Sequence, residues 1–388
     1  MMDASADNRD VTSERQAAAS GPVPGRDGKV PRVWLLTGYR AGDNAQVLAL
    51  AEALGWPFEV KHFTYRKYEF LTNVLIGKTL AGIDRGRSDV LLPPWPDLVI
   101  TAGRRNEPVA RWIQGRNGGR TRLVHLGRSW AKTDHFDLIV TTPQYSVPPR
   151  PNVLEIEAPL HRVTAARLAI AADRWRATVA DLPRPLIAVM VGGDSPPYVF
   201  GAAMAQRLGR QAAALARAGN GSLLVTTSPR TSAAAAAALR QAIDVPYQFY
   251  DWAPDPETNP HLGYLALADA IIVTGESMSM VAEACDTGKA VHIFDMGSGW
   301  TRMRAPDDNQ SGTDSPPPSE RFTLKRLQHW LLAHCLPARI RRDMRNILRP
   351  LVAKGRATWL GDAPRRATVP PATDLQQTVA RVRALFGG

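Results

Sequence analysis

Four glycine-bearing turns are the places in this sequence where the backbone can approach a ligand most closely. Each turn follows a short apolar run and precedes a helical pattern, so it should lie at the exit of a strand. Such turns present unpaired N–H groups at a helix start, and these favour anions such as phosphates. The turns are Thr37–Asn44, Thr101–Pro108, Val191–Ser195 and Thr274–Ala284.

The first two turns are predicted to bind an acceptor substrate, with arginines that suit an anion. A structural tight turn with Asp43 or Asn44 as helix cap, or a solvated arginine pair, would explain the same residues without a ligand. The first turn lacks the GxGxxG pattern, so no nicotinamide site is expected. Asp43 is the candidate general base, because it can lie close to an acceptor hydroxyl. The predicted substrate-binding residues are Gly38, Arg40, Gly42, Asn44, Gly103, Arg104 and Arg105.

The last two turns are predicted to bind a nucleotide. The paired glycines after Val191 can hold a diphosphate without a metal, provided that the side chain of Asp194 turns away. In the fourth turn, small hydroxyl residues lie at a helix start, and Glu283 follows within the helix. Glu283 is either solvated or accepts hydrogen bonds from both ribose hydroxyls. The predicted nucleotide-binding residues are Gly192, Gly193, Gly275, Glu276, Ser277, Met278, Ser279 and Glu283.

The elements that carry these turns alternate between short apolar strands and helical patterns, which is typical of parallel sheets covered by helices. The fold class is therefore α/β, with two Rossmann-like doubly wound domains and an interdomain cleft. The expected strands are 33–36, 58–61, 98–101, 123–126 and 138–140 in the first half, and 186–191, 223–226, 248–250, 271–274 and 291–294 in the second.

The expected division of the chain follows from these series. A disordered N-terminal segment at 1–30, which has no apolar period, precedes an acceptor domain at 31–160. A linker helix at 161–184 leads to a nucleotide-sugar donor domain at 185–335. A C-terminal helical segment at 336–388 should pack on the body, because its last apolar residues follow a helical stripe.

The net charge of +12 would steer the protein toward phosphates, anionic lipid or nucleic acid. Much of the excess is arginine late in the chain, which a solvated surface also explains. Nucleic acid is not expected, because no basic–aromatic interleaving accompanies the charge. Without an apolar targeting or spanning segment, the protein is expected to be cytoplasmic. An anionic membrane surface at the inner face of the membrane, or a lipid-linked acceptor, would suit the charge.

The fourth turn and its helix resemble the donor-site signature of GT-B glycosyltransferases. In that signature a Gly/Ser-rich turn precedes a helix carrying Glu-Ala and then Gly-Lys. Ala290 stands where proline is usual. The resemblance implies that the turn contacts donor phosphates and that the glutamate holds the ribose. The matching residues are Gly275, Ser277, Ser279 and Glu283.

Four further stretches, at 36–46, 97–105, 192–194 and 275–280, are similar to the mitochondrial-fission "elongated mitochondria" family, and the similarity runs over about residues 32–335. Plant members imply recruitment of a dynamin-related protein to mitochondria, whereas bacterial members resemble glycosyltransferases. The predicted function is a metal-independent GT-B glycosyltransferase that uses a nucleotide-diphosphate sugar as donor and no cofactor. The alternatives are a non-enzymatic scaffold that recruits a protein or membrane partner, and a sugar-nucleotide epimerase.

Overall fold

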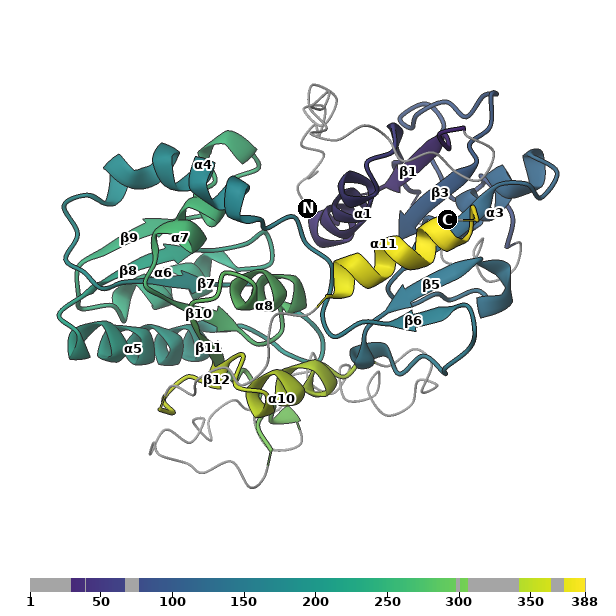
Figure 1. The fold of residues 1–388 in the computed structure, drawn as a ribbon. Coiled ribbons are helices and arrows are strands. Elements are labelled where there is room, and N and C mark those ends of the chain that lie inside the picture. Colours follow the sequence, from purple (N-terminus) through teal and green to yellow (C-terminus); the bar gives the residue numbers. More distant parts are fainter. Residues whose placement is uncertain are drawn as a thin grey trace. The chain divides into compact units, whose positions relative to one another are not determined.

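The computed structural model describes residues 29–38, 40–66, 77–297, 301–305, 342–363 and 373–387. They form two compact units, of which unit 1 lies within Met1–Arg162 and Ala372–Gly388, and unit 2 within Val163–Pro371. Residues 1–28 of the segment expected to be disordered lie outside the described residues. Figure 1 shows both units.

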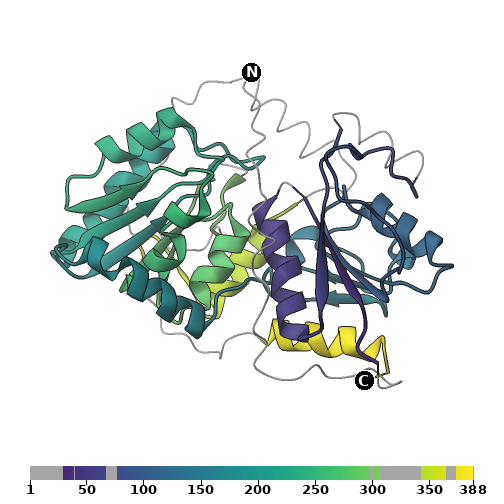
Figure 2. The ribbon, with the colours of Figure 1, turned by 90° about the horizontal axis from the view of Figure 1, so that it is seen from above.

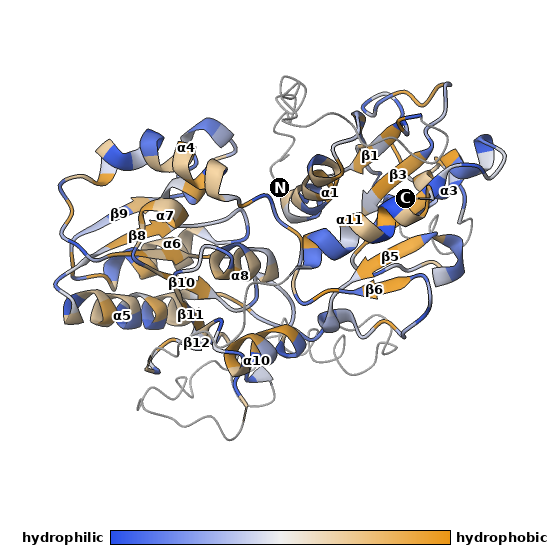
Figure 3. Ribbon diagram, viewed as in Figure 1, coloured by the Kyte–Doolittle hydropathy of each residue, from blue (hydrophilic) through white to orange (hydrophobic). Residues whose placement is uncertain are grey.

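Unit 1 contains a parallel six-stranded sheet in the order β2-β1-β3-β4-β5-β6. The helix α1 ends at Gly55, whose left-handed backbone (φ 67°) suits glycine. The central strands β1 and β3 are buried over their whole length, as expected for strands covered on both faces, and Figure 3 colours them as hydrophobic. The elements are β1 (Val33–Thr37), α1 (Ala41–Leu54), β2 (Phe58–His62), β3 (Leu98–Ala102), α3 (Glu107–Arg116), β4 (Arg122–Leu126), β5 (Leu138–Thr141), β6 (Val153–Glu155) and α11 (Asp374–Ala384).

The last helix, α11, belongs to unit 1 although it comes at the end of the chain. It packs beside α1, as Figures 1 and 2 both show. Val382 is fully buried in the core of unit 1, and the ring of Phe386 lies 5.3 Å from that of Trp56. Burial of side chains of this size stabilises by roughly 1.5–3 kcal/mol each.

Unit 2 contains a second parallel six-stranded sheet, in the order β12-β11-β10-β7-β8-β9. The helices α4 and α6 are capped by the preceding residues Thr164 and Ser232, whose side chains accept hydrogen bonds from the N–H groups of Arg167 and Ala235. The elements are α4 (Ala165–Trp175), β7 (Leu186–Met190), α5 (Ala202–Ala218), β8 (Ser222–Thr226), α6 (Ala233–Gln241), β9 (Tyr247–Tyr250), α7 (His261–Leu267), β10 (Ala270–Thr274), α8 (Met278–Cys285), β11 (Ala290–Phe294), α10 (Arg345–Ala353) and β12 (Thr358–Trp359).

The expected fold class is confirmed: two Rossmann-like, doubly wound α/β units follow one another, as in the GT-B type. The interdomain cleft stays a prediction. The structure divides the chain differently near its end, because α10 belongs to unit 2 and α11 to unit 1, whereas the sequence suggested one segment at 336–388. The expected linker helix corresponds to α4, which packs on α7 within unit 2.

Two short strands were not expected from the sequence. The strand β6 has three residues, none of them buried, and β12 has only two. Neither gives the run of apolar residues by which a buried strand is recognised. Within the described ranges, every helix is too short or too polar to span a lipid bilayer.

Candidate functional site

Each sheet contains one pair of adjacent strands from which the chain continues to opposite sides of the sheet, and we call the position between them the switch. In unit 2 this switch lies between β7 and β10, because β7 continues to β8 on one side and β10 to β11 on the other. In unit 1 the corresponding strands are β1 and β3. Open parallel sheets bind ligands beyond the carboxyl ends of such strands. The four turns singled out in the sequence are the four turns at these positions.

Gly192 follows β7 at the switch of unit 2 and contacts two other segments, the end of β10 with its turn and the loop after β8. Its N–H donates to Thr274 Oγ1 at 2.9 Å, and its carbonyl accepts from the Ser228 hydroxyl. A Cβ on Gly192 would collide with Glu276 Oε1 and would lie 2.8 Å from Arg230 Nη2. The backbone therefore passes so close to these charged side chains that only glycine fits.

The next two residues lock this turn onto the loop after β8. Gly193 has a positive φ of 101°, and a Cβ there would lie 2.7 Å from the N atom of Thr231. The Asp194 N–H donates to the carbonyl of Arg230 at 3.1 Å. Asp194 Oδ1 accepts from the N–H of Phe200 at 2.8 Å, so its side chain is engaged within its own loop.

Glu276 is a fully buried carboxylate directly after β10. Its Oε1 lies 3.5 Å from Arg230 Nη2, while its Oε2 is buried without a hydrogen-bond partner among the described residues. Burial raises the pKa of Glu276 to about 7, and the positive charge of Arg230 opposes this rise. Near neutral pH, Glu276 can therefore accept a hydrogen bond as a carboxylate or donate one as an acid.

The other predicted residues of the fourth turn have different environments. Gly275 lies against the sulfur of Met303, which a Cβ would approach to 2.6 Å. Ser277 precedes α8 and is nearly buried, but its hydroxyl does not cap the helix. Met278 is part of the core of unit 2, whereas Ser279 is half-buried. Binding of a ligand by these residues therefore stays a prediction, and Met278 could contribute to it only through its backbone.

Glu283 lies one turn further along α8 and is paired with a histidine. Its Oε2 is 2.7 Å from Nε2 of His261, the first residue of α7, and both side chains are largely buried. Glu283 is therefore not the solvated helix residue that was the simpler alternative. A ribose bound by Glu283 would use Oε1 or would displace the imidazole.

In unit 1, Asn44 closes the turn after β1. Its side chain accepts from the Gly38 N–H at 3.0 Å and donates to the Gly38 carbonyl at 2.7 Å. Asn44 thus stabilises the turn, but it does not cap the helix, because it lies within α1 and the N-cap residue Arg40 makes no capping side-chain hydrogen bond. Arg40 precedes α1 and is exposed, and Gly42 lies half-buried in the first turn of the helix.

Asp43 connects the two turns of unit 1. A Cβ on Gly103, which has a φ of 74°, would lie 2.8 Å from Asp43 Oδ2. The predicted base therefore lies at the switch position, directly beside the turn after β3. Asn106, buried behind this turn, donates to the carbonyls of Leu36 and Ala102 and so joins the ends of β1 and β3.

The predicted arginines of the second turn lie over aromatic rings. The guanidinium carbon of Arg104 is 4.5 Å from the centre of the Trp130 ring, and that of Arg105 is 5.7 Å from the ring of Tyr65. A third arginine, Arg128, follows β4 and lies 5.4 Å from the ring of Tyr145. Arg128 is not among the substrate-binding residues predicted from the sequence.

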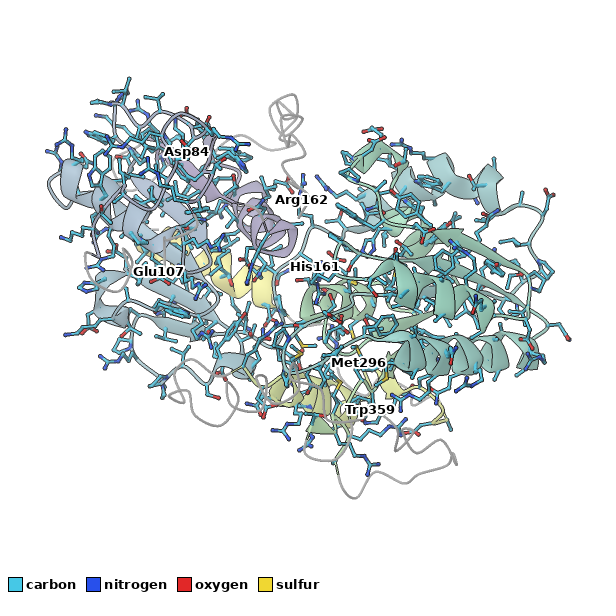
Figure 4. All side chains as sticks on the ribbon, turned by 180° about the vertical axis from the view of Figure 1, so that it is seen from behind. Asp84, Glu107, His161, Arg162, Met296 and Trp359 are labelled. Carbon is cyan, nitrogen blue, oxygen red and sulfur yellow. The ribbon has the colours of Figure 1, made fainter. Side chains whose placement is uncertain are left out.

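Glu107, labelled in Figure 4, is a second buried carboxylate, at the start of α3. Its two oxygens accept from the N–H groups of Trp130 and Ala131, each at 2.8 Å. Burial raises its pKa to about 7. His125 Nε2 is 3.7 Å away, and burial lowers the pKa of this histidine to about 4. Glu107 therefore fixes the loop after β4 from inside the unit.

Sequence reasoning also missed Ser228 and Arg230, which reach the site from the loop after β8. The run Thr226-Thr227-Ser228-Pro229-Arg230 is rich in hydroxyls and follows a predicted strand. This run contains no glycine, so the search for glycine-bearing turns after predicted strands passed over it. In the described part of the chain, no three His, Cys, Asp or Glu side chains are grouped so that they could hold a metal ion.

Solved structures with a similar chain course include the following two. UDP-GlcNAc 2-epimerase of Methanocaldococcus jannaschii is 11% identical, with 92% of this chain and 100% of that chain covered and a TM-score of 0.46. MurG of Acinetobacter baumannii is 14% identical, with 92% of each chain covered and a TM-score of 0.40. Likenesses at this level assign no activity.

Relatives by sequence point to one family. Mitochondrial fission protein ELM1 of Arabidopsis thaliana is 28% identical over 220 residues, which are 51% of this chain and 51% of that protein, so the chain spans about half the length of the plant relative. Uncharacterized protein RP120 of Rickettsia prowazekii (strain Madrid E) is 22% identical over 295 residues, 68% of this chain and 82% of that protein. The family model described as Mitochondrial fission ELM1 matches residues 41–309, and the chain therefore belongs to this family.

Proposed function

We propose that this protein is a glycosyltransferase that takes a sugar from a nucleoside-diphosphate donor bound at the switch of unit 2. The observation that carries the proposal is the turn at Gly192, where the backbone lies against Glu276 and Arg230 with no room for a side chain. Turns of this kind at a Rossmann-type switch bring backbone close to phosphates. A diphosphate is the proposed ligand because the guanidinium of Arg230 and the start of α8, which both favour anions, lie at the same carboxyl edge of the sheet.

The diphosphate would lie against Arg230 and the start of α8. The first N–H groups of this helix have no partner within the helix, and the helix dipole adds partial positive charge there. Arg230 supplies a full charge, and its side chain is 39% exposed. These groups would stabilise the leaving nucleoside diphosphate without a metal or other cofactor.

The two carboxylates of this region would bind hydroxyl groups of the donor. Glu283, held by His261, would bind the ribose, as the resemblance to the GT-B signature implies. The buried Oε2 of Glu276 would gain a hydrogen-bond partner if a hydroxyl group of the nucleotide sugar reached it. Leaving a buried hydrogen-bond acceptor without a partner costs free energy. Ser277 and Ser279 would contribute their hydroxyls beside Gly275.

The acceptor would bind at the switch of unit 1, between the Gly38 and Gly103 turns. Asp43 would remove the proton from the attacking hydroxyl, because it lies where the two turns meet. We further propose that the protein acts in the cytoplasm, peripherally at the inner face of the membrane. There an anionic surface or a lipid-linked acceptor would match its net charge of +12.

Calorimetric titration with UDP, GDP, ADP and their sugar derivatives tests the donor site. At least one nucleotide should bind the full chain, and Arg230→Gln should weaken that binding at least tenfold through the lost charge. Arg240→Gln is the matched control, since Arg240 is also an arginine of unit 2 paired with an acid, Asp251. No binding by any nucleotide, or equal loss in both variants, would refute the proposal.

Products then define the reaction. A transferase incubated with donor alone should release nucleoside diphosphate slowly, whereas a sugar-nucleotide epimerase would return an altered nucleotide sugar. Chromatography with mass detection, together with NMR of the sugar, separates the two.

Family membership favours one other function, a non-enzymatic scaffold that recruits a protein or a membrane. A scaffold predicts no nucleotide turnover, and no loss of partner binding in the Arg230→Gln variant. Flotation with anionic vesicles, measured for wild type and this variant, tests the membrane form of the alternative.

A further inference from the structure

We propose that the carboxyl edge of the sheet in unit 1 is a phosphate-binding site built from Arg104, Arg105 and Arg128, and that the acceptor carries a phosphate or diphosphate ester. The identification of the bound phosphate compound as the acceptor rests on the proposed function. The phosphate site itself rests on the geometry of unit 1.

The three arginines come from adjacent strand exits. Arg104 and Arg105 follow β3, and Arg128 follows β4, which pairs with β3 in parallel. Parallel strands that pair in register end at the same edge of the sheet, so their exit loops are neighbours. Three positive charges are thus gathered next to the switch between β1 and β3.

Each guanidinium lies over an aromatic ring supplied by another part of the chain. The rings are those of Trp130, Tyr65 and Tyr145, at 4.5, 5.7 and 5.4 Å from the guanidinium carbons. When the face of a guanidinium covers a ring, its N–H groups point outward along the rim, and two of them form the fork that matches phosphate oxygens. Half-buried arginines held in this way are pre-oriented, unlike arginines on a solvated surface.

The loop that carries Arg128 and Trp130 is fixed from beneath. Glu107 accepts the N–H groups of Trp130 and Ala131, and it is buried, so the loop has a built anchor. Fixing the ring of Trp130 also fixes the surface on which Arg104 lies. Glu107 is therefore a positioning residue for this site.

A carboxylate beside the arginines fits an acceptor with two functional groups. Asp43 Oδ2 lies against Gly103, which directly precedes Arg104. A phosphate on the arginines would place a hydroxyl of the same molecule within reach of Asp43. This combination selects a phosphorylated alcohol or sugar rather than a neutral one, whether it is soluble or attached to a lipid.

Inorganic pyrophosphate, titrated into the full chain by calorimetry, tests the site. Pyrophosphate should bind, and the double variant Arg104→Gln/Arg128→Gln should weaken that binding at least tenfold. The change Arg104→Lys keeps the charge but loses the planar fork, and it should also weaken binding clearly. Arg116→Gln is the matched control, because Arg116 lies over Trp112 at the other end of α3 and should leave binding unchanged.

Hydrogen exchange locates the effect. Pyrophosphate should protect amides at 103–106 and 127–131 in the wild type but not in the double variant. Any second binding at the donor site should appear as protection near 192–194 and should disappear in Arg230→Gln instead. If pyrophosphate protects 103–106 but not 192–194, the proposed donor site is refuted and the arginine site is still supported.

Two further titrations distinguish the sources of the phosphate. Farnesyl diphosphate below its micelle concentration represents a lipid-linked acceptor, and glucose 1-phosphate a soluble one. If one of these two compounds binds more tightly than pyrophosphate, and this binding depends on Arg104 and Arg128, the site is supported and that compound indicates whether the acceptor is lipid-linked or soluble. Absence of pyrophosphate binding, or pyrophosphate binding that is unchanged in the folded double variant, overturns the proposal.

Discussion

Replacing Glu276 by glutamine should remove a large part of the pH dependence of the stability of unit 2. The carboxyl group is fully buried, and its pKa is raised from 4.5 to about 7, chiefly by desolvation. In the unfolded chain the same group ionises near 4.5. Between these values the folded state holds a proton that the unfolded state has lost.

The sign and size follow from this difference. The folded state binds more protons, so stability is fully present below the unfolded pKa and decreases as pH rises through the folded pKa. One pKa unit corresponds to about 1.4 kcal/mol, so the loss between about pH 4 and pH 8 is on the order of 3 kcal/mol. For a domain of this size that is a shift of the melting temperature on the order of 10 °C.

The assay is the melting temperature of wild type and Glu276→Gln at a series of pH values from 4 to 8. The difference between them should change in favour of the variant as pH rises. Glu257→Gln is the control, because Glu257 is 73% exposed and should follow the wild type. If the Glu276→Gln and wild-type curves stay parallel, the carboxyl ionises at the same pH in both states and our account of the site is wrong.

Three other outcomes follow from the same contacts. Gly192→Ala should lower the melting temperature by several degrees and abolish nucleotide binding, because a Cβ collides with Glu276, whereas Gly201→Ala, with no atom within 4 Å of the new Cβ, should do neither. Asn44→Ala should destabilise unit 1 by about 1–3 kcal/mol in urea unfolding, since the turn at Gly38 loses two hydrogen bonds; an unchanged midpoint would contradict this. Glu283→Gln should weaken nucleotide binding at least tenfold by calorimetry, and equal affinities would remove the carboxylate from the ribose site.

The central strands could be predicted because burial on both faces leaves a trace in composition. The runs at 98–101 and 271–274 are apolar and end at a turn, and both are strands in the structure. The edge strand β6 leaves no such trace, since its residues are only partly covered. A local pattern reveals an element only when its own side chains must be apolar.

The candidate site was predictable in its glycines but not in its partners. A glycine after a strand can be recognised locally, so the turns at Gly192 and Gly275 could be found. Arg230 meets Glu276 only because β8 and β10 flank β7, and 46 residues separate the two in sequence. The pairing of Glu283 with His261 likewise depends on how α7 and α8 lie against the sheet. Contacts of this kind depend on the order of the strands in the sheet, which cannot be obtained from the spacing of residues in the sequence.

The packing of α11 on unit 1 has a consequence for synthesis on the ribosome. Val382 is a buried member of a core whose other buried members lie between residues 33 and 160, and Phe386 packs against this core. The helix that completes the core of unit 1 is therefore translated after every described element of unit 2. Until α11 has been made, the face of α1 near Trp56 lacks the helix that covers it.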